Sequence, residues 1–442
     1  MSGIAEVLLN LGFEVSGSDL KSSDTTRHLA QLGALIYGTH ESSNVKGADV
    51  VVYSSAVPST NPEVVEAKTN AVPTIPRTEM LAELMRLKFA ITIAGSHGKT
   101  TTTSLISSVL ACGGLDPTVV VGGKLKALGS NARLGDSRYV VAEADESDGK
   151  FVQLPSSIAV ITNIDLEHLD FYPDLEAIKD AFVEYTSKVP FYGSVVLCAD
   201  DANVQSIVPR IRKRKVSYSL DGDADLVGKI VDRKPHGWLF EIQFQSSRLG
   251  EIRVATPGEH SVRNALAATA VGLELDLHFD AIKQGIETFE GVGRRFERKG
   301  EASGVTVVDD YGHHPTEIAA TIKAARENFT NRLIVFFQPH RYSRTQALAE
   351  QFGLCFEGAD TVFITDVYAA GEEPIPGVSS DLIVDNIRKS SQVNVVRVGT
   401  IGALVTEAVT YLRDGDLVLT LGAGDIYRAG EQLLEALEKA TK

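Results

Sequence analysis

The chain has 442 residues, of which 23% are charged, and its formal net charge is −15 at pH 7. A single hydrophobic core does not grow to this size, so we expect about three domains. A nucleic acid or an anionic membrane would need a clustered basic face, so the acidic balance argues against both as partners and favours small molecules.

Cysteine usage and hydropathy indicate a protein of the reducing cytoplasm. The three cysteines, Cys112, Cys198 and Cys355, show no metal-ligand spacing and suit a reducing compartment. The N-terminus carries no basic segment before its apolar stretch, and no run of about 18 apolar residues follows. We therefore expect a cytoplasmic protein without a membrane span. The sequence indicates no oligomeric state.

Apolar, β-branched runs alternate with helix-periodic segments along most of the chain, which is typical of parallel sheets covered by helices. This pattern predicts an α/β protein, with domains at residues 1–87, 88–295 and 296–442. In the first domain, strands are predicted at residues 13–19, 33–38 and 48–57, with crossover helices at 25–33 and 61–70.

The second and third predicted domains differ in their pattern of strands. In the second, strands are predicted at residues 89–95, 138–147, 156–165 and 194–201. Alternating polar and apolar positions between residues 216 and 256 then predict an antiparallel meander. A glycine-rich junction at 291–297 leads to the third domain. There, five strands are predicted at residues 304–311, 332–339, 360–368, 394–399 and 416–424.

The segment GSHGKT, residues 95–100, lies between a predicted strand and a helix-compatible run. Its first glycine, Gly95, stands closer to the second than the usual spacing G-x-x-x-x-G-K-[ST] places it. Backbone amides at a helix start still attract a phosphate, Lys99 adds a mobile cation, and the Thr100 hydroxyl can ligate Mg²⁺. We therefore predict a phosphate-binding loop; the alternative is a glycine turn with a solvated lysine.

Polar residues also follow two later strands, at the edge where open α/β sheets bind ligands. Glu143, Asp145, Glu146 and Asp148 crowd into one short loop, and His168 stands among carboxylates in the next. The alternatives are a solvated acidic loop and a structural histidine. Beside a phosphate loop, a Mg²⁺ that bridges phosphate oxygens requires a carboxylate, so we favour ligand roles.

Eight motifs carry a resemblance to a known family: GSHGKTTTT, EADESD, TNIDLEHLD, GEHSVRNALAA, GVGRRF, DDYGHHPTE, QPHRYSRT and YAAGEEPIPG. Their order and spacing resemble the Mur ligases of peptidoglycan synthesis, and among these the members that add L-alanine to UDP-N-acetylmuramate. The family's loop is the short form G-x-x-G-K-T-T, which Gly95 matches. The resemblance implies an incomplete Rossmann-like first domain, a P-loop ATPase-type central sheet with an added antiparallel portion, and a Rossmann-like third domain.

The resemblance also implies an activity and its ligands. ATP would phosphorylate a substrate carboxylate, and an amine would attack the acyl phosphate to give an amide, ADP and phosphate. The implied substrates are UDP-N-acetylmuramate, L-alanine and ATP, with Mg²⁺. Thr100 and Glu143 are implied to hold one Mg²⁺, and His168 to hold a second that the substrate carboxylate shares. Lys99, Glu143, His168 and Arg344 are the implied catalytic residues.

The remaining contacts are implied motif by motif. Those of ATP are Gly95, Ser96, His97, Gly98, Lys99, Thr100, Thr101, His260, Asn264, Arg295 and Asp310. Those of the UDP-sugar are Asp19, Ser54, Ser55, Asn131, Glu146 and Asp148. Those of the amino acid are His340, Arg341, Arg344 and Glu372. Ser261 departs from the asparagine that many members carry at its position.

Three other functions stay open at this point: a ligase that recycles a preformed tripeptide, a P-loop hydrolase or switch, and an ATP-binding paralogue with an impaired sugar site. The last is considered because the family pattern G-I-G-G-x-G-M-S-G-I-A is present only from Met1 onward. We expect Met1 to be an internal methionine of a longer protein. Because the missing strand would be central in the first sheet, its neighbours are expected to have unpaired edges.

Overall fold

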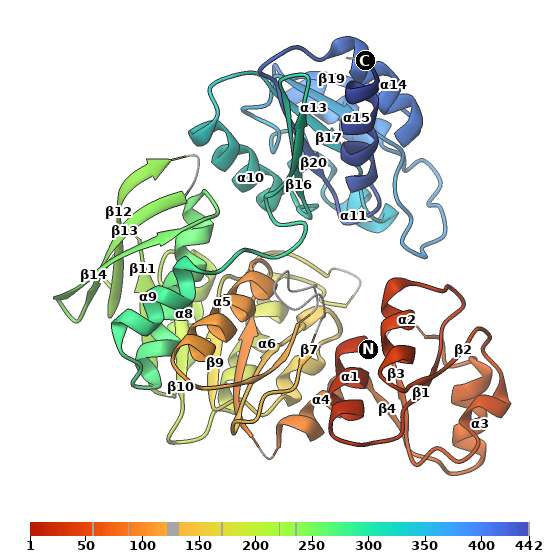
Figure 1. Ribbon diagram of the computed structural model, residues 1–442, viewed down its shortest axis with the longest axis vertical. Helices are drawn as coiled ribbons and strands as arrows, with labels where there is room; N and C mark the ends of the chain where they lie inside the picture. The colour runs from red at the N-terminus through yellow and green to blue at the C-terminus, as the bar shows by residue number, and fades with distance from the viewer. Residues whose placement is uncertain are drawn as a thin grey trace. The chain divides into compact units, whose positions relative to one another are not determined.

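A computed structural model describes residues 1–54, 57–86, 88–121, 132–168, 171–220, 222–234 and 237–440 (Figure 1). These residues pack into two compact units. The first comprises residues 1–229, 241–252 and 263–290, and the second comprises residues 230–240, 253–262 and 291–442. No helix in the described ranges is both long enough and apolar enough to cross a bilayer.

Short parallel strand pairs form the N-terminal part of the first unit. β1 (Ser16–Ser18) pairs with β2 (Leu35–Tyr37), and β3 (Val51–Tyr53) pairs with β4 (Thr74–Pro76). Within the described residues these pairs are two separate sheets, and their strands are half-buried or exposed. The accompanying helices are α1 (Ser2–Asn10), α2 (Asp24–Gln31), α3 (Pro62–Thr69) and α4 (Arg77–Met85).

A ten-stranded sheet runs through the centre of the chain in the order β14-β13-β12-β11-β10-β9-β5-β8-β6-β7. In this order, all neighbouring strands from β12 to β6 pair in parallel, and the last strand, β7, pairs antiparallel to β6. Its strands are β5 (Phe89–Ala94), β6 (Thr118–Val120), β7 (Ala132–Arg133), β8 (Tyr139–Glu143), β9 (Ile158–Ile161), β10 (Ser194–Cys198), β11 (Lys215–Ser219), β12 (Leu226–Lys234), β13 (Gly237–Phe244) and β14 (Ser247–Val254). The four strands predicted for residues 89–201 are present, whereas β6 and β7 were not predicted.

Helices cover this sheet because its central strands are apolar on both faces. Every residue of β9 and β10 is buried, and Ala90, Phe151, Phe182 and Tyr185 share one core with Ile4 of α1 and Met85 of α4. The helices of this part are α5 (Lys99–Cys112), α6 (Leu175–Ser187), α7 (Ala202–Ile207), α8 (Glu259–Glu274) and α9 (Phe279–Glu287). Two short 3₁₀ turns, η2 (Glu146–Asp148) and η3 (Lys150–Gln153), follow β8.

The second unit contains a six-stranded sheet in the order β15-β16-β20-β17-β18-β19. β15 pairs antiparallel to β16, and the other pairs are parallel. Its strands are β15 (Glu297–Ala302), β16 (Val305–Asp310), β17 (Leu333–Phe337), β18 (Thr361–Ile364), β19 (Asn394–Arg397) and β20 (Leu417–Leu421). The five strands predicted for this region are confirmed as β16 to β20.

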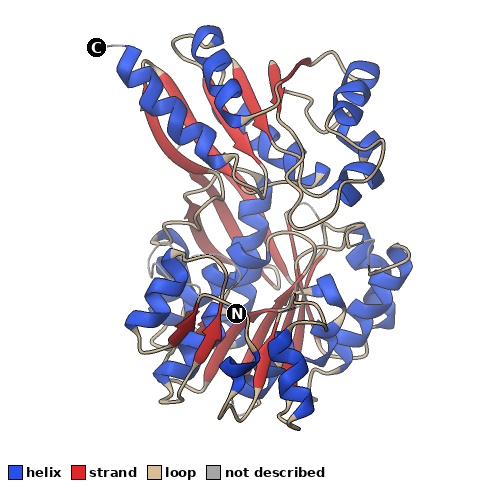
Figure 2. Ribbon diagram, turned by 90° about the vertical axis from the view of Figure 1, so that its right-hand side faces the viewer, coloured by secondary structure: helices blue, strands red, loops and turns tan. Residues whose placement is uncertain are grey.

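Both faces of the second unit's sheet are covered by helices (Figure 2). Side chains along a strand alternate between faces, so Leu333, Val335 and Phe337 join one core while Ile334 and Phe336 join the other. The helices are α10 (Pro315–Asn328), α11 (Tyr342–Ala347), α12 (Ala349–Phe352), α13 (Asp381–Ser390), α14 (Ile401–Tyr411) and α15 (Tyr427–Ala440).

Candidate active site

The predicted phosphate loop connects β5 to α5 at the carboxyl edge of the ten-stranded sheet. Gly95 has a φ of +135° and Gly98 a φ of +81°, values that residues other than glycine rarely adopt. A Cβ on Gly95 would lie 2.1 Å from Thr162 Oγ1, and one on Gly98 would lie 2.9 Å from Asn264 Oδ1. The loop therefore requires glycine at both positions for its backbone path, and at Gly95 also for space.

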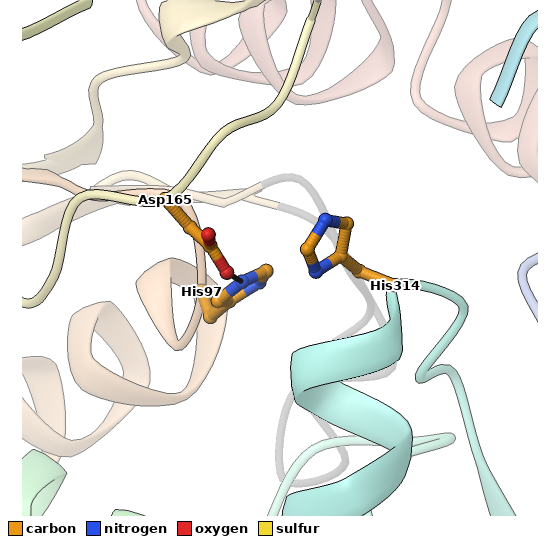
Figure 3. Close-up of side chains that lie close together, drawn as sticks. All are labelled: His97, Asp165 and His314. Atoms are coloured by element: carbon orange, nitrogen blue, oxygen red, sulfur yellow. Dashed lines mark hydrogen bonds and ion pairs between the residues drawn. The ribbon is translucent and has the colours of Figure 1, made fainter. Parts of the chain in front are cut away.

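The segment that follows β9 holds the loop in place. The Asn163 side chain accepts a hydrogen bond from the His97 amide at 2.8 Å, and Thr162 Oγ1 donates to the His97 carbonyl at 2.7 Å. The Asp165 amide donates to Ser96 Oγ at 2.8 Å. The His97 ring points at the Asp165 carboxylate, with Nε2 and Oδ2 3.1 Å apart (Figure 3). Adjacent parallel strands thus present two loops that support one another.

Lys99 is the first residue of α5 and turns back over the loop. Its ammonium donates to the Gly95 carbonyl at 2.6 Å, to the Ser96 carbonyl at 3.2 Å and to Glu146 Oε1 at 2.8 Å. Burial alone would lower the pKa of Lys99, but the Glu146 and Asp145 carboxylates outweigh it and raise that pKa. The lysine therefore carries its positive charge at the phosphate loop.

Three potential ligand groups converge beside Lys99. Glu146, Glu167 and His168 each offer one ligand atom, and these atoms lie within 4.8 Å of one another. His168 Nε2 is 3.4 Å from Glu146 Oε1 and 3.8 Å from Glu167 Oε2. The Glu146 side chain is only 2% exposed, and its Oε2 has no hydrogen-bond partner among the described residues. A set of two carboxylates and one imidazole is suited to a divalent cation, and the unpartnered Oε2 of Glu146 is available as a ligand.

Charge compensation keeps Glu146 ionised despite its burial. Burial would raise the pKa of Glu146, but the Lys99 ammonium and the His168 ring hold it below its ordinary value. Burial would likewise lower the pKa of His168, and Glu146 raises it instead. Neighbouring Asp145 forms an ion pair with Arg77 of α4 at 3.0 Å, and its other oxygen accepts from the Ser147 amide at the start of η2. Arg77 and Glu167 were not identified from the sequence.

The other predicted residues of the first unit are distributed around the loop and the N-terminal strands. Thr100 and Thr101 lie in the first turn of α5, and Glu143 ends β8. Asp148 accepts from the Lys150 amide at 3.1 Å. Asp19 is exposed after β1, and Ser54 is half-buried after β3. Two further predicted residues, Ser55 and Asn131, lie outside the residues that the structure describes.

In the second unit, two predicted nucleotide contacts lie near the 291–297 junction. Asp310 accepts hydrogen bonds from the Phe296 amide at 2.7 Å and the Gly312 amide at 2.8 Å, and burial raises its pKa to about 6 despite the nearby Arg295. The Arg295 guanidinium lies over the Tyr311 ring, 5.2 Å from its centroid. Elsewhere in this unit, His260 lies in the first turn of α8, and His314, also drawn in Figure 3, caps α10.

The predicted amino-acid contacts come together after β17. Arg344 Nη1 lies 3.4 Å from His340 Nδ1, and Arg341 Nη1 lies 4.0 Å from Glu372 Oε1. Glu372 also accepts from the Ser343 hydroxyl at 2.6 Å. Burial, followed by the Arg344 charge, lowers the pKa of His340 to about 4. The Arg341 and Arg344 guanidinium groups and the Glu372 carboxylate therefore offer charges opposite to the two charged groups of a zwitterion.

Sequence comparison identifies the chain's relatives. Models described as "Mur ligase family, catalytic domain", "Mur ligase middle domain" and "Mur ligase, glutamate ligase domain" match residues 1–89, 93–272 and 294–424. The UDP-N-acetylmuramate--L-alanine ligase of Geotalea daltonii is 53% identical over 440 residues, which cover 100% of this chain and 96% of that protein. The chain belongs to the Mur ligase family. The enzyme of the same name from Geobacter sulfurreducens is 54% identical over 442 residues, again covering 100% and 96%.

A solved Mur ligase has the same fold. The crystal structure of UDP-N-acetylmuramate-alanine ligase MurC from Thermotoga maritima matches 100% of this chain and 97% of that one, with a TM-score of 0.83 and 27% identity. Together with the matched segments, it confirms the α/β class and the succession of N-terminal, central and C-terminal Mur ligase domains. The roles of individual residues of this Mur ligase stay predictions.

Proposed function

We propose that this Mur ligase joins L-alanine to the lactyl carboxylate of UDP-N-acetylmuramate in peptidoglycan synthesis, at the expense of ATP, which yields ADP and phosphate. Relatives that are 53% and 54% identical over the whole chain bear the name UDP-N-acetylmuramate--L-alanine ligase. The structural observation that carries the proposal is the glycine loop whose Lys99 lies 2.8 Å from Glu146, beside His168. This is a phosphate site combined with potential metal ligands, as an ATP-dependent ligase requires.

The proposed reaction explains why these charges are gathered. A carboxylate is an anion and a poor electrophile, so transfer of a phosphoryl group to it requires neutralisation of several negative charges at one place. Lys99 neutralises phosphate oxygens, and the loop amides orient them. Bound Mg²⁺ supplies further charge neutralisation; Thr100 and Glu143 are proposed to hold one ion, and His168 a second, with Glu146 and Glu167 at hand.

Each part of the chain has a proposed share in binding. His260, Asn264, Arg295 and Asp310 complete the nucleotide contacts. The UDP-sugar is assigned to Asp19, Ser54, Ser55, Asn131 and Asp148; Glu146, which the resemblance also implies for the sugar, faces Lys99 and is proposed below to act at the cation. Alanine is assigned to the zwitterion-suited group: His340, Arg341, Arg344 and Glu372. An arginine fork matches a carboxylate, so we assign Arg344 and Arg341 to the alanine carboxylate and to the acyl intermediate. The neutral amine then attacks the acyl carbon, phosphate leaves with the electrons of the C–O bond, and the nitrogen releases a proton to give the amide.

A coupled ADP-release assay tests the proposal. The chain is incubated with ATP, Mg²⁺ and UDP-N-acetylmuramate, with L-alanine, with a tripeptide, or with neither. We expect ADP release that depends on both the UDP-sugar and alanine. Release with the tripeptide alone would identify a recycling ligase, release without sugar or amine a hydrolase, and ATP binding without any release an impaired paralogue.

The metal assignments predict an order of effects. Glu143→Ala and His168→Ala should each lower activity and raise the Mg²⁺ concentration for half-maximal rate, because each removes a proposed ligand. Asp145→Ala should change that concentration less, because the Asp145 carboxylate is occupied by Arg77 and the Ser147 amide. Mg²⁺ titrations of the three variants check this. The opposite order would move the ligand role to Asp145.

The amine predicts a pH dependence. The attacking α-amino group has a pKa of about 8 and must be neutral, so kcat/KM for alanine should rise between about pH 7 and pH 9. Burial lowers the pKa of His340 to about 4 and that of His313 to about 3, so neither ring titrates in this window. A flat profile, measured at saturating ATP and UDP-sugar, would mean that another step limits the rate.

A further inference from the structure

We infer that Glu146 is a latch that keeps Lys99 from the nucleotide until a divalent cation takes over the carboxylate. The inference rests on the proposed function in so far as it takes ATP and a divalent cation as the ligands of the loop. It adds a role for Glu146 and a mechanism by which the two ligands depend on one another.

The ammonium of Lys99 has no donor left for a phosphate. A lysine carries three N–H donors, and here they go to the carbonyls of Gly95 and Ser96 and to the carboxylate of Glu146. A phosphate-loop lysine acts by reaching the terminal phosphates. At least one of the three bonds must therefore break when ATP binds, and only the bond to Glu146 leads to a different segment of the chain.

Breaking that bond has a cost that a cation can remove. The Glu146 side chain is 2% exposed, so without Lys99 its charge would lose its nearest compensation inside the protein. Glu167 and His168 place two further ligand atoms within 4.8 Å. A divalent cation bound by these groups would replace the ammonium at Glu146, engage its unpartnered Oε2 and release Lys99 to the phosphates.

Lys99 is the moving partner because Glu146 is held at its backbone. The Tyr172 hydroxyl donates to the Glu146 carbonyl at 2.9 Å. On the other side, Asp145 accepts from the Ser147 amide at 3.1 Å and is paired with Arg77 at 3.0 Å. The Lys99 ammonium is carried on a flexible four-carbon stem, whereas the Glu146 carboxylate is on a shorter side chain that is only 2% exposed.

The test measures ATP affinity with and without metal. The dissociation constant of ATP is determined by calorimetry in a chelating buffer and in Mg²⁺, for the wild-type chain and for Glu146→Gln. Metal-free ATP should bind Glu146→Gln on the order of 10-fold more tightly, because Lys99 then has to leave a neutral amide oxygen instead of a carboxylate, and the two hydrogen bonds differ in strength by about that factor. The gain in affinity on adding Mg²⁺ should be smaller than in the wild type. Unchanged or weaker metal-free binding would overturn the latch.

Two controls separate the latch from simple repulsion between carboxylates and ATP. Glu167→Gln also removes a negative charge but leaves the bond between Lys99 and Glu146, so its gain in metal-free ATP affinity should be much smaller. In a Lys99→Ala background, Glu146→Gln should bring no gain in metal-free affinity; an equal gain in both backgrounds would overturn the latch.

The readout also separates the latch from the ligase proposal. Should Glu146→Gln fail to fold, Glu146→Asp shortens the carboxylate and tests the same bond, with the same expected sign. Since the readout is ATP binding, normal binding without ligase activity would contradict the proposed function alone. A wild-type chain that bound no ATP even with Mg²⁺ would contradict both.

Discussion

Lys99→Ala is expected to lower turnover by at least ~10²-fold, the usual scale for loss of one preorganised charge contact in an active site. The Lys99 ammonium lies at the start of α5, and the Glu146 carboxylate 2.8 Å away keeps it charged. Steady-state rates at saturating substrates measure the effect, and the expected loss is in kcat. Near wild-type turnover would contradict the assignment of the phosphate loop.

Two controls accompany this variant. Lys150→Ala removes a lysine from η3 whose ammonium is 3.8 Å from Asp148, and its effect on turnover should be far smaller. Thermal unfolding is compared as well, because loss of Lys99 leaves the buried Glu146 with one cation fewer and lowers stability. Rates are therefore expressed per folded enzyme, at a temperature where both variants remain folded.

Gly95→Ala is expected to abolish tight ATP binding and to destabilise the fold. Its φ of +135° costs a non-glycine residue about 1–3 kcal/mol, and the new Cβ would meet Thr162 Oγ1 at 2.1 Å. If Thr162 moves away, it loses its hydrogen bond to the His97 carbonyl, and the loop loses part of its support. ATP titration calorimetry and the melting temperature measure the two effects.

Gly114→Ala is the matched control for backbone strain. Gly114 also has a positive φ, +75°, but a Cβ there would meet no atom within 4 Å. It should lower the melting temperature through strain and leave ATP affinity near that of the wild type. If the two variants bound ATP equally well, close approach at Gly95 would not matter for the site.

The elements that could be predicted were those whose signal is local. The phosphate loop is one continuous segment between an apolar strand and a helix, so its position followed from residues 89–112 alone. The strands β16 to β20 are apolar on both faces, which makes their runs distinct. β15, with the sequence ERKGEA, was missed because four of its six residues are charged, so it contains no apolar run. Strands β1 to β3 were predicted at the right places but are only three residues long, and β4 was not predicted.

The sequence by itself determined the family, the α/β class and the residue types at the carboxyl edge of the sheet. The order of the motifs and the ends of the apolar runs follow directly from the order of residues in the chain. Tertiary structure decided which of the acidic residues faces Lys99. The strand ends at Glu143, and the η2 turn that follows, held by Arg77 and Tyr172 from other elements, directs Glu146 toward the lysine. Residue spacing does not encode that direction, since it depends on contacts between segments far apart in the chain. For the same reason, the support of the loop by Thr162, Asn163 and Asp165 appears only once β9 lies beside β5.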